Sequence, residues 1–351
     1  MAYSSIIKPS TFTNTKLYAG NGSTQSITGV GFQPDWTWIK NRSSTNNNRL
    51  FDSVRGAGKN LVSNSTGAEV DAGTGTNGQL RSFISDGFTV GSDGSVNNNN
   101  ENIVSWNWKA GTSVSGNTTG SGTVKTYTGS VNTTAGFSIV KYVGNGTAGH
   151  TIPHNLGAVP RMLIVKRIDD ASAWHVYNGS LGATKRVSLN TADAEDADGT
   201  AWNNTTPTSS VFTVGESGTT NVNNANTIAY CFAEKQGYSK FGTYIGNGNA
   251  NGTFVYTGFK PAWVLCKTAS IGGEDWALSD NKRNPFNETT TALFPNSASG
   301  DQSSNSIDML SNGFKMRTTG SYRNQSGVTY IYMVFAENPF VASNFNAGTA
   351  R

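Results

Sequence analysis

Apolar and polar residues alternate over short stretches along most of the chain. In FQPDWTWIKN, which begins at Phe32, Trp36 and Trp38 alternate with Asp35 and Thr37. A side-chain period of two is typical of a β-strand with its two faces in different surroundings. Asn-Gly, Asp-Gly and Gly-Asn pairs separate these runs, and such pairs tolerate the positive φ of tight hairpin turns. The pattern therefore predicts an all-β protein.

Some strands are predicted to be covered on both faces. In VTYIYMVFAE, Ile331, Met333 and Phe335 oppose Tyr332 and Val334, so both faces are apolar. Such a run predicts a central, buried strand. No window carries a 3.6-residue apolar stripe, and TADAEDADGTAW (191–202) is the best candidate for a short turn of helix.

The same phrases occur three times in constant order. Tyr-X-Gly-Asn-Gly begins at Tyr18, Tyr142 and Tyr244. A phrase with Pro, an apolar strand and Lys follows, and the separation from Tyr to Lys is 22, 24 and 23 residues. Two further shared phrases carry a short aromatic strand and a long strand near the end of each copy. This fixed order predicts a tandem triplication. The repeated lysines are Lys40, Lys166 and Lys267.

Each copy has the size of a small β-domain with its own core, about 100 residues. We therefore predict three β-sandwich, jelly-roll-like domains at 17–111, 137–238 and 239–340. Residues 1–16 are interpreted as an N-terminal arm and 341–351 as a C-terminal tail. The Gly/Ser/Thr-rich segment 112–136 is predicted to be a flexible or extended linker, with one added strand at 124–127 as an alternative. Copies two and three are expected to pack together, and the first copy is expected to sit apart.

The composition of the chain mainly excludes some classes of function. Charged residues make up 14%, aromatic residues 11%, and the net charge of +4 is spread without any run of Lys or Arg. A nucleic-acid partner would require a basic patch, so none is predicted. No apolar run is long enough to span a bilayer, and no secretory signal is recognised, so we expect a soluble protein made in a cytoplasm without membrane insertion. Cys231 and Cys266 lie in strand-like runs and are predicted to be buried free thiols.

The candidate chemistry is sparse. His150 and His154 stand four apart in HTIPHN, but Pro153 forbids a helix, so a polar loop is preferred to a metal site. No histidine occurs in the first or third copy, and no pair of carboxylates recurs in all three. We therefore predict no catalytic residue, no cofactor and no metal, and a protein that is not an enzyme.

The residues that do recur are given structural roles. The lysines that end the apolar strands are expected to be solvated or paired rather than nucleophilic. Asp52 and Asp280 occupy matching positions, where the middle copy has Tyr177 or Asn178. Three arginines are predicted to be roughly equivalent and to pair with nearby acids, and five tryptophans are predicted to fill the core. These sets are Arg55, Arg186 and Arg283, and Trp36, Trp38, Trp106, Trp108 and Trp263.

Exposed aromatic residues are the remaining functional signal. Trp202 lies in GTAWNNTTP and Tyr322 in TGSYRNQSG, two segments that look like loops. Aromatic rings stack on the apolar faces of sugars, and Asn side chains bind hydroxyl groups. Trp202 and Tyr322 are therefore the candidate glycan-binding residues, and the alternative is that both fill the core.

The phrases TKLYAGNGSTQSITGVGFQPDWTWIKNRSS, SDGFTVGSDGSVNNNNENIVSWNWKAG and IYMVFAENPF resemble a repeat family common in bacteriophages of marine bacteria. Its members are described as tail-fibre-like or virion structural proteins. The resemblance covers nearly the whole chain and implies a virion component, but it supplies no site residue.

Two functions follow from this resemblance as expectations. The first is a tail fibre or spike that binds a host-surface glycan. The alternative is a capsid decoration or other purely structural protein that binds virion partners. A glycan depolymerase ranks third. A homo-oligomer is expected, and a trimer is suggested by analogy with fibres.

Overall fold

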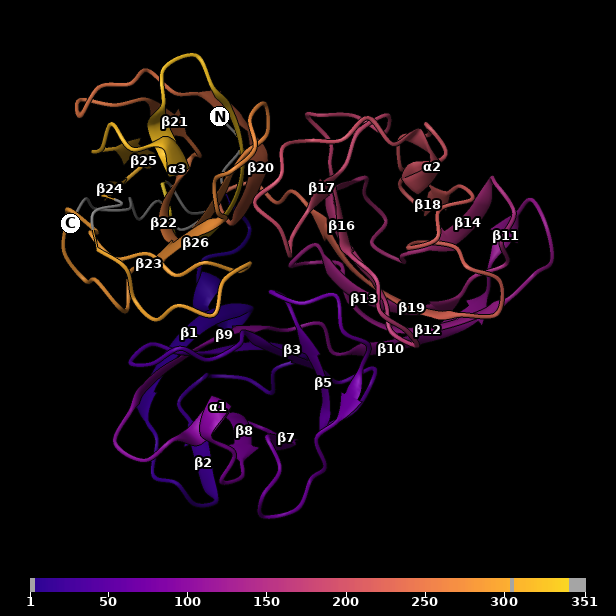
Figure 1. The fold of residues 1–351 in the computed structure, drawn as a ribbon, viewed down its shortest axis with the longest axis horizontal. Coiled ribbons are helices and arrows are strands. Elements are labelled where there is room, and N and C mark those ends of the chain that lie inside the picture. The colour runs from indigo at the N-terminus through magenta and orange to yellow at the C-terminus, as the bar shows by residue number, and fades with distance from the viewer. Residues whose placement is uncertain (1–3, 304–305, 341–351) are drawn as a thin grey trace.

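The computed structural model describes residues 4–303 and 306–340 and is built almost entirely of antiparallel β-strands. The strands form six sheets, two in each repeat (Figure 1). In each repeat a larger sheet packs on a three-stranded sheet; a one-turn α-helix directly precedes the last long strand in repeats 1 and 3, and the helix of repeat 2 comes one strand earlier. The all-β class and the three sandwich-like repeats predicted from the sequence are confirmed.

Repeat 1 begins with a 3₁₀ turn, η1 (Pro9–Thr11), and its first strand starts inside the predicted N-terminal arm. Its helix is α1 (Gly94–Asn97). Its larger sheet contains, in spatial order, β1 (Thr13–Ala19), β9 (Asn102–Trp108), β3 (Trp36–Asn41), β4 (Arg49–Asp52), β5 (Lys59–Val62) and β6 (Val70–Asp71). Its smaller sheet contains β2 (Gln25–Thr28), β8 (Gly87–Val90) and β7 (Leu80–Ile84).

Repeat 2 has the largest sheet, and its helix is α2 (Gly199–Trp202). The predicted helical turn over 191–202 is thus helical only in its last four residues. The larger sheet contains β10 (Thr112–Asn117), β12 (Thr126–Asn132), β13 (Phe137–Val143), β19 (Asn226–Ala233), β15 (Pro160–Arg167), β16 (Trp174–Asn178) and β17 (Val187–Ser188). The smaller sheet contains β11 (Thr119–Gly120), β14 (His150–Pro153) and β18 (Val211–Val214).

Repeat 3 contains the longest strand, and its helix is α3 (Ser321–Asn324). The larger sheet contains β20 (Ser239–Ile245), β26 (Thr329–Pro339), β22 (Phe259–Thr268) and β23 (Ala277–Asp280). The smaller sheet contains β21 (Phe254–Tyr256), β25 (Gly313–Met316) and β24 (Ile307–Leu310). The predicted tail at 341–351 lies outside the described residues.

Two expectations about the joints are wrong. Segment 112–136, predicted to be a linker, contributes three strands to repeat 2, because its alternating residues pair along the edges of β13 and β14. Repeat 1 does not sit apart, because its larger sheet packs against those of the other two repeats (Figure 1). The linker composition misled because Ser, Thr and Gly suit an exposed edge hairpin as well as a flexible chain.

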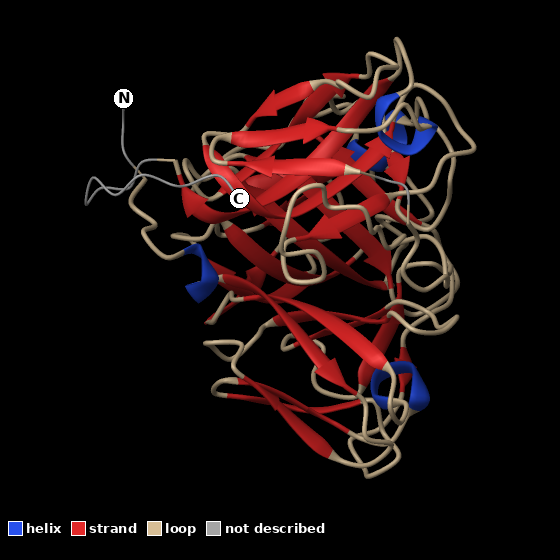
Figure 2. Ribbon diagram, turned by 90° about the vertical axis from the view of Figure 1, so that its left-hand side faces the viewer, coloured by secondary structure: helices blue, strands red, loops and turns tan. Residues whose placement is uncertain are grey.

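The molecule has one central core and a separate core inside each sandwich. The larger sheets turn one face to the centre, where Trp36 stacks on Tyr230 at 4.5 Å between ring centroids and Trp108 meets Trp263 at 5.6 Å. Their other faces cover the three sandwich cores. Trp36, Trp263 and Phe335 are buried, as predicted. The three α-helices lie on one side of the molecule, and η1 lies on the other (Figure 2).

The threefold Tyr-X-Gly-Asn-Gly phrase closes each sandwich in the same way. The hydroxyls of Tyr18, Tyr142 and Tyr244 donate to the carbonyls of Val96 in α1, Thr220 in a turn after β18, and Arg323 in α3, at 2.7, 2.5 and 2.7 Å. The first glycine of each phrase lies against backbone, and a Cβ on Gly144 would come 2.3 Å from the carbonyl oxygen of Val222. Only glycine fits so close an approach.

A buried asparagine then holds the middle of each phrase. Asn97, Asn221 and Asn324 accept from the backbone N–H of Asn21, Asn145 and Asn247, at 3.0, 2.9 and 3.0 Å. Their amide groups donate to the carbonyls of Gly91, Gly215 and Thr318, each at 2.8 Å. One side chain in each repeat therefore joins the opening loop to the end of the sandwich.

We expect Asn221→Ala to lower the free energy of unfolding by at least about 2 kcal/mol, because it leaves several buried backbone groups without a partner. The measurement is urea unfolding followed by circular dichroism. Asn223→Ala, which changes an exposed residue of the same loop, serves as the control. Equal midpoints for the two variants would show that this anchor contributes nothing.

Candidate functional site

The side chains shared by all three repeats gather at the junctions between repeats. Each repeated lysine is fully buried, and its Nζ donates to a carbonyl of the neighbouring repeat. Lys166 donates to Thr66, Lys267 to Ala192 and Lys40 to Ala298, at 3.1, 3.1 and 3.0 Å. Repeat 2 thus contacts repeat 1, repeat 3 contacts repeat 2, and repeat 1 contacts repeat 3. The contacts form a closed head-to-tail ring.

Burial controls the charge of these lysines. Removal from water lowers the pKa of Lys40, Lys166 and Lys267 to about 8, although nearby carboxylates at Lys40 and Lys267 oppose the shift. The sequence-based expectation of a structural role agrees with these contacts, but the expectation of a solvated side chain is wrong. Carbonyl oxygens at the repeat junctions take the place of water for these amines.

These lysines predict how stability depends on pH. Their folded pKa is about 8, whereas an unfolded lysine titrates near 10.4, so the unfolded chain binds more protons between these values. The contribution of these lysines to the free energy of unfolding should therefore rise from about pH 8 to about pH 10. Cys231 and Cys266 contribute a fall over the same range, because burial raises their pKa and unfolded thiols titrate at about 8.5. Tyrosines of the unfolded chain add to this fall near pH 10, because burial raises the pKa of Tyr330 and Tyr332 to about 12.

Urea unfolding of the unmodified chain and of Lys166→Met at about pH 7.5 and about pH 9.5 isolates the lysine contribution. Relative to the unmodified chain, Lys166→Met should be less stable at the higher pH than at the lower, and Lys8→Met, at an exposed lysine, should show no such change. The same pH dependence for Lys166→Met and the unmodified chain would contradict the assignment.

A second set of donors follows the same ring. The indole N–H of Trp174 donates to Val62 at 3.0 Å, and that of Trp276 donates to Ser188 at 2.9 Å. Asn48 occupies the equivalent position in repeat 1, and its amide donates to Phe294 and Ser297 at 3.1 and 2.9 Å. Tryptophan and asparagine side chains therefore make an equivalent hydrogen bond, from the start of a short strand to a backbone carbonyl of the adjacent repeat.

Two of the three junctions also contain a fully buried ion pair. Asp52 pairs with Arg55 at 2.5 Å, and Asp280 pairs with Arg283 at 2.6 Å. Each aspartate accepts a further hydrogen bond from the neighbouring repeat. Tyr230 Oη donates to Asp52 at 2.8 Å, and Trp106 Nε1 donates to Asp280 at 3.0 Å.

The third junction has uncharged side chains at the same place. Strand register makes Asn178 the equivalent of Asp52 and Asp280. Each of them pairs with the residue two positions after the proline that the three repeats share; these partners are Met162, Trp36 and Trp263, respectively. Leu181 replaces the arginine, and Met333 is the equivalent of Trp106 and Tyr230. The predicted equivalence of Arg186 is therefore wrong, because Arg186 lies near the β17 strand and pairs with Asp196 and Asp198.

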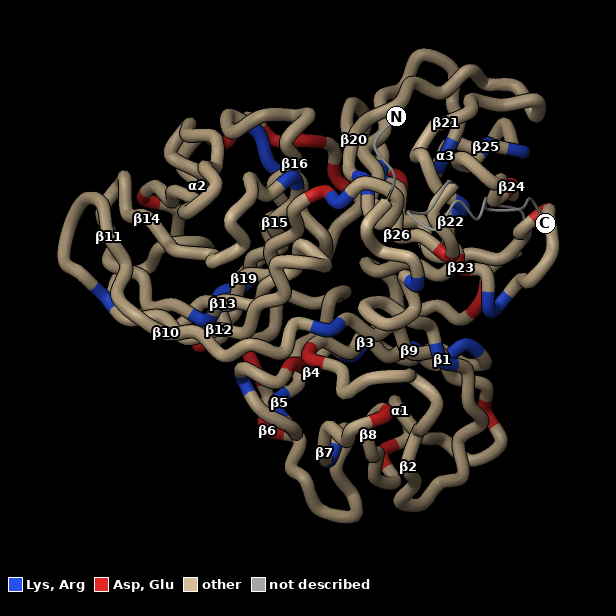
Figure 3. Tube along the Cα trace, turned by 180° about the vertical axis from the view of Figure 1, so that it is seen from behind, with Lys and Arg blue, Asp and Glu red and all other residues tan. Residues whose placement is uncertain are grey.

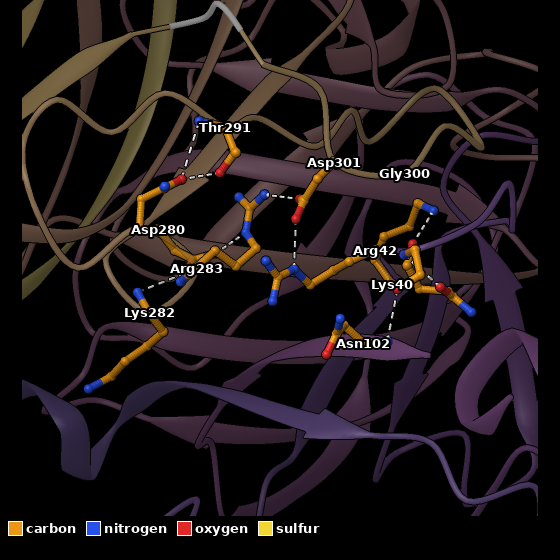
Figure 4. A network of polar contacts seen from close by, with 12 residues as sticks. Lys40, Arg42, Asn102, Asp280, Lys282, Arg283, Thr291, Gly300 and Asp301 are labelled. Carbon is orange, nitrogen blue, oxygen red and sulfur yellow. Dashed lines mark hydrogen bonds and ion pairs between the residues drawn. The ribbon is translucent and has the colours of Figure 1, made fainter. Parts of the chain in front are cut away.

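Figure 4 shows the junction between repeats 1 and 3. Asp301 accepts from Arg42 Nε and from Arg283 Nη1, both at 2.8 Å, so one carboxylate joins arginines of both repeats. The backbone N–H of Asp301 also donates to the carbonyl of Arg42 at 3.0 Å. Along the described chain, Lys and Arg positions are interspersed with Asp and Glu positions (Figure 3).

One polar cleft lies between repeats 1 and 2. It encloses about 570 Å³, and its lining includes Gln33, Asp35, Ser53, Ser113, Thr128 and Ser130. Asp35 is nearly buried there; it accepts from Ser53 Oγ at 2.7 Å and from the Ala110 N–H at 2.8 Å. Burial raises the pKa of the Asp35 carboxyl despite these hydrogen bonds. Hydroxyl groups and one carboxylate are the groups that recognise a polyhydroxylated ligand.

The histidines and cysteines are structural. His150 is buried on β14, where its Nδ1 lies 3.0 Å from Asn221 Oδ1, so the predicted polar loop is a strand. Burial lowers the pKa of His154 to about 4 and that of His175 to about 3. Cys231 and Cys266 are buried free thiols, as predicted. In residues 4–303 and 306–340, no group of three or more His, Cys, Asp or Glu could hold a metal ion.

The two predicted glycan-binding residues differ in their surroundings. Trp202 is only 1% exposed; its ring packs against Tyr177, and its Nε1 donates to Lys185. Its prediction as a glycan-stacking residue is therefore wrong, because α2 turns the ring into the sandwich core. Tyr322 is half-buried and stacks on Phe294 at 5.5 Å between centroids. Its role in glycan binding stays a prediction.

Several junction residues were not found from the sequence. Asn48 differs in type from its equivalents Trp174 and Trp276, so no shared letter marks the position. The receiving carbonyls of Thr66, Ala192 and Ala298 are backbone groups. Their only signal is a constant position two residues after Asn64, Asn190 and Asn296, which recur in all three copies.

The fold and these junctions define a class of protein, a single chain of three β-sandwich repeats closed into a ring around a common core. The chain belongs to the family described as "Domain of unknown function (DUF7483)", whose model matches residues 8–339. No curated protein matches the chain, and no solved structure does. In the described residues, no helix is long and apolar enough to cross a membrane.

Proposed function

We propose that this chain is a non-catalytic structural component of a bacteriophage particle that binds other particle proteins. The phage assignment comes from the resemblance of the repeated phrases to virion proteins. The structural role is supported by the hydrogen bonds that the polar side chains shared by the repeats make within the protein. The lysines, asparagines and indoles that recur in the repeats are hydrogen-bonded to the protein's own backbone. The polar residues that recur in the repeats therefore hold the three repeats together.

The loss of Trp202 as a surface residue makes assembly with particle proteins the better-supported of the two functions. The test is to locate the chain on purified particles with a labelled antibody in electron microscopy, and to measure binding of the purified chain to empty capsids. Labelling of the particle with capsid binding supports the proposal. Absence of the chain from purified particles would overturn it. The expected homo-oligomer, with a trimer by analogy with fibres, stays a prediction.

Host-glycan attachment remains the second candidate, favoured by the hydroxyl-rich cleft between repeats 1 and 2. Saturation-transfer NMR with host envelope polysaccharide tests it. Thr128→Trp fills the cleft from an exposed strand position, so it should abolish the transfer while the chain stays folded. Transfer that persists in this variant would exclude the cleft, and shortening of the polysaccharide would contradict a binding-only protein.

A further inference from the structure

One equivalent edge of the sandwich differs among the three repeats in its covering strands and in its exposed residues. This edge consists of the strand with the opening tyrosine and the neighbouring strand of the smaller sheet. In repeat 1 the two strands, β1 and β2, are the last strands of their sheets, and in repeat 3 β20 and β21 are also the last. In repeat 2 the equivalent β13 and β14 are internal.

Residues 112–132 cover this edge in repeat 2. β12 pairs with β13 from Tyr127 opposite Tyr142 to Asn132 opposite Phe137, and β11 pairs with β14. Tyr127 and Val131 of the added strand enter the sandwich core. The chain thus contains an example of an extended, Ser/Thr/Gly-rich segment that completes the sandwich.

Strand register identifies the outward residues of the three edges. Ile27, Ile152 and Val255 are equivalent, since they pair with Phe88, Phe212 and Phe314. The outward neighbours on either side, together with the residue after the opening tyrosine, make three matched sets. These are Ala19, Ser26 and Thr28 in repeat 1, Val143, Thr151 and Pro153 in repeat 2, and Ile245, Phe254 and Tyr256 in repeat 3.

The three matched sets of residues differ in size and in exposure to water. The set in repeat 1 is exposed and small, and the set in repeat 2 is half-buried beside its covering strands. In repeat 3, Ile245, Phe254 and Tyr256 are 63%, 44% and 51% exposed, so both strands of an open edge carry large exposed apolar side chains, and Lys240 Nζ lies 5.5 Å from the centroid of the Tyr256 ring. An open edge in this fold does not require such residues, because repeat 1 does without them.

We propose that the β20–β21 edge of repeat 3 binds an extended β-strand from another particle protein by strand addition, which rests on the proposed structural role. In an antiparallel sheet, the backbone groups of alternate residues point away from the existing partner. On β20 these include Thr243, and no described strand pairs with that side. The incoming segment resembles 112–132: one strand pairs with β20 as β12 pairs with β13 and points its apolar side chains into the sandwich as Tyr127 does, and a second, short strand pairs with β21 beside Phe254 and Tyr256 as β11 pairs with β14.

A peptide of residues 112–133, which contains the strands that cover both β13 and β14 in repeat 2, serves as the probe, with the full-length chain as the receptor. Fluorescence anisotropy should detect binding, and hydrogen exchange should show protection of the amides of β20 near Thr243. Phe254→Arg should weaken binding by at least about tenfold, and Ser26→Arg, at the equivalent exposed position of repeat 1, should not change it. Thr243→Pro removes an outward N–H without a bond to β26 and should also abolish binding.

The same positions test the edge in the particle. A photo-cross-linking residue at 254 should join the chain to a different particle protein, and one at 26 should not. Failure of the peptide to protect β20, or equal cross-linking from both positions, would overturn the proposal. Cross-links between two copies of this chain would instead assign the edge to self-association and also overturn it. Absence of the chain from particles, with binding of the peptide intact, would reject only the particle role.

Discussion

Replacement of Asp52 by alanine should lower the free energy of unfolding by about 3–5 kcal/mol. The side chains of Asp52 and Arg55 are 0% and 1% exposed, so the variant leaves a guanidinium buried at the junction of repeats 1 and 2 with its main partner removed. The hydroxyl of Tyr230 also loses its acceptor. Chemical unfolding of the variant and the unmodified chain at the same pH measures the difference.

The chain supplies its own control for this prediction. At the third junction, the residues equivalent to Asp52, Arg55 and Tyr230 are Asn178, Leu181 and Met333. The triple variant Asp52→Asn, Arg55→Leu, Tyr230→Met places the same residue types in the first junction and should recover most of the lost stability, because it removes both buried charges together and leaves neither unpaired. A triple variant as unstable as Asp52→Ala would show that the junctions are not interchangeable.

Replacement of Trp36 by alanine should also cost about 3–5 kcal/mol, and it should do so for the whole chain at once. Trp36 contacts Trp108 of its own repeat at 4.4 Å and Tyr230 of repeat 2 at 4.5 Å between centroids. A cavity at this position therefore weakens the core that all three sheets share. Scanning calorimetry should show one transition, moved to lower temperature.

Trp202→Ala provides the comparison, because that ring lies in the sandwich core of repeat 2. It should destabilise repeat 2 without removing contacts between repeats. If Trp36→Ala instead split the melting curve and left the transitions of repeats 2 and 3 unchanged, the repeats would fold independently and the central core would not couple them.

Much of the fold could be predicted from the sequence because its signals are local. Alternation of Trp36 and Trp38 with polar neighbours indicates a strand, and Gly-Asn-Gly indicates a turn, without knowledge of distant residues. Three occurrences of the same phrases then give the repeats. Segment 112–136 was misjudged because edge strands and linkers share a polar, Gly-rich composition, and only pairing with β13 distinguishes them.

The arrangement of the repeats could not be predicted in the same way. The junctions depend on contacts such as Lys40 with Ala298, which join residues far apart in sequence through a backbone carbonyl. Any residue type can present a carbonyl, so the sequence contains no mark of the acceptor. Trp202 failed as a surface candidate for a related reason, since a polar loop composition does not show which way a single ring turns.

The head-to-tail ring has an evolutionary consequence. A homotrimer of one repeat could close in the same way, but its single sequence would have to encode both sides of one identical contact. Duplication and fusion of the gene remove that requirement, because each junction then consists of two independently variable sequences. The junctions of this chain do differ: two contain a buried ion pair, and the third has Asn178, Leu181 and Met333 instead. Fusion has also freed the outer edges, so that one copy can acquire a partner that its two sisters do not bind.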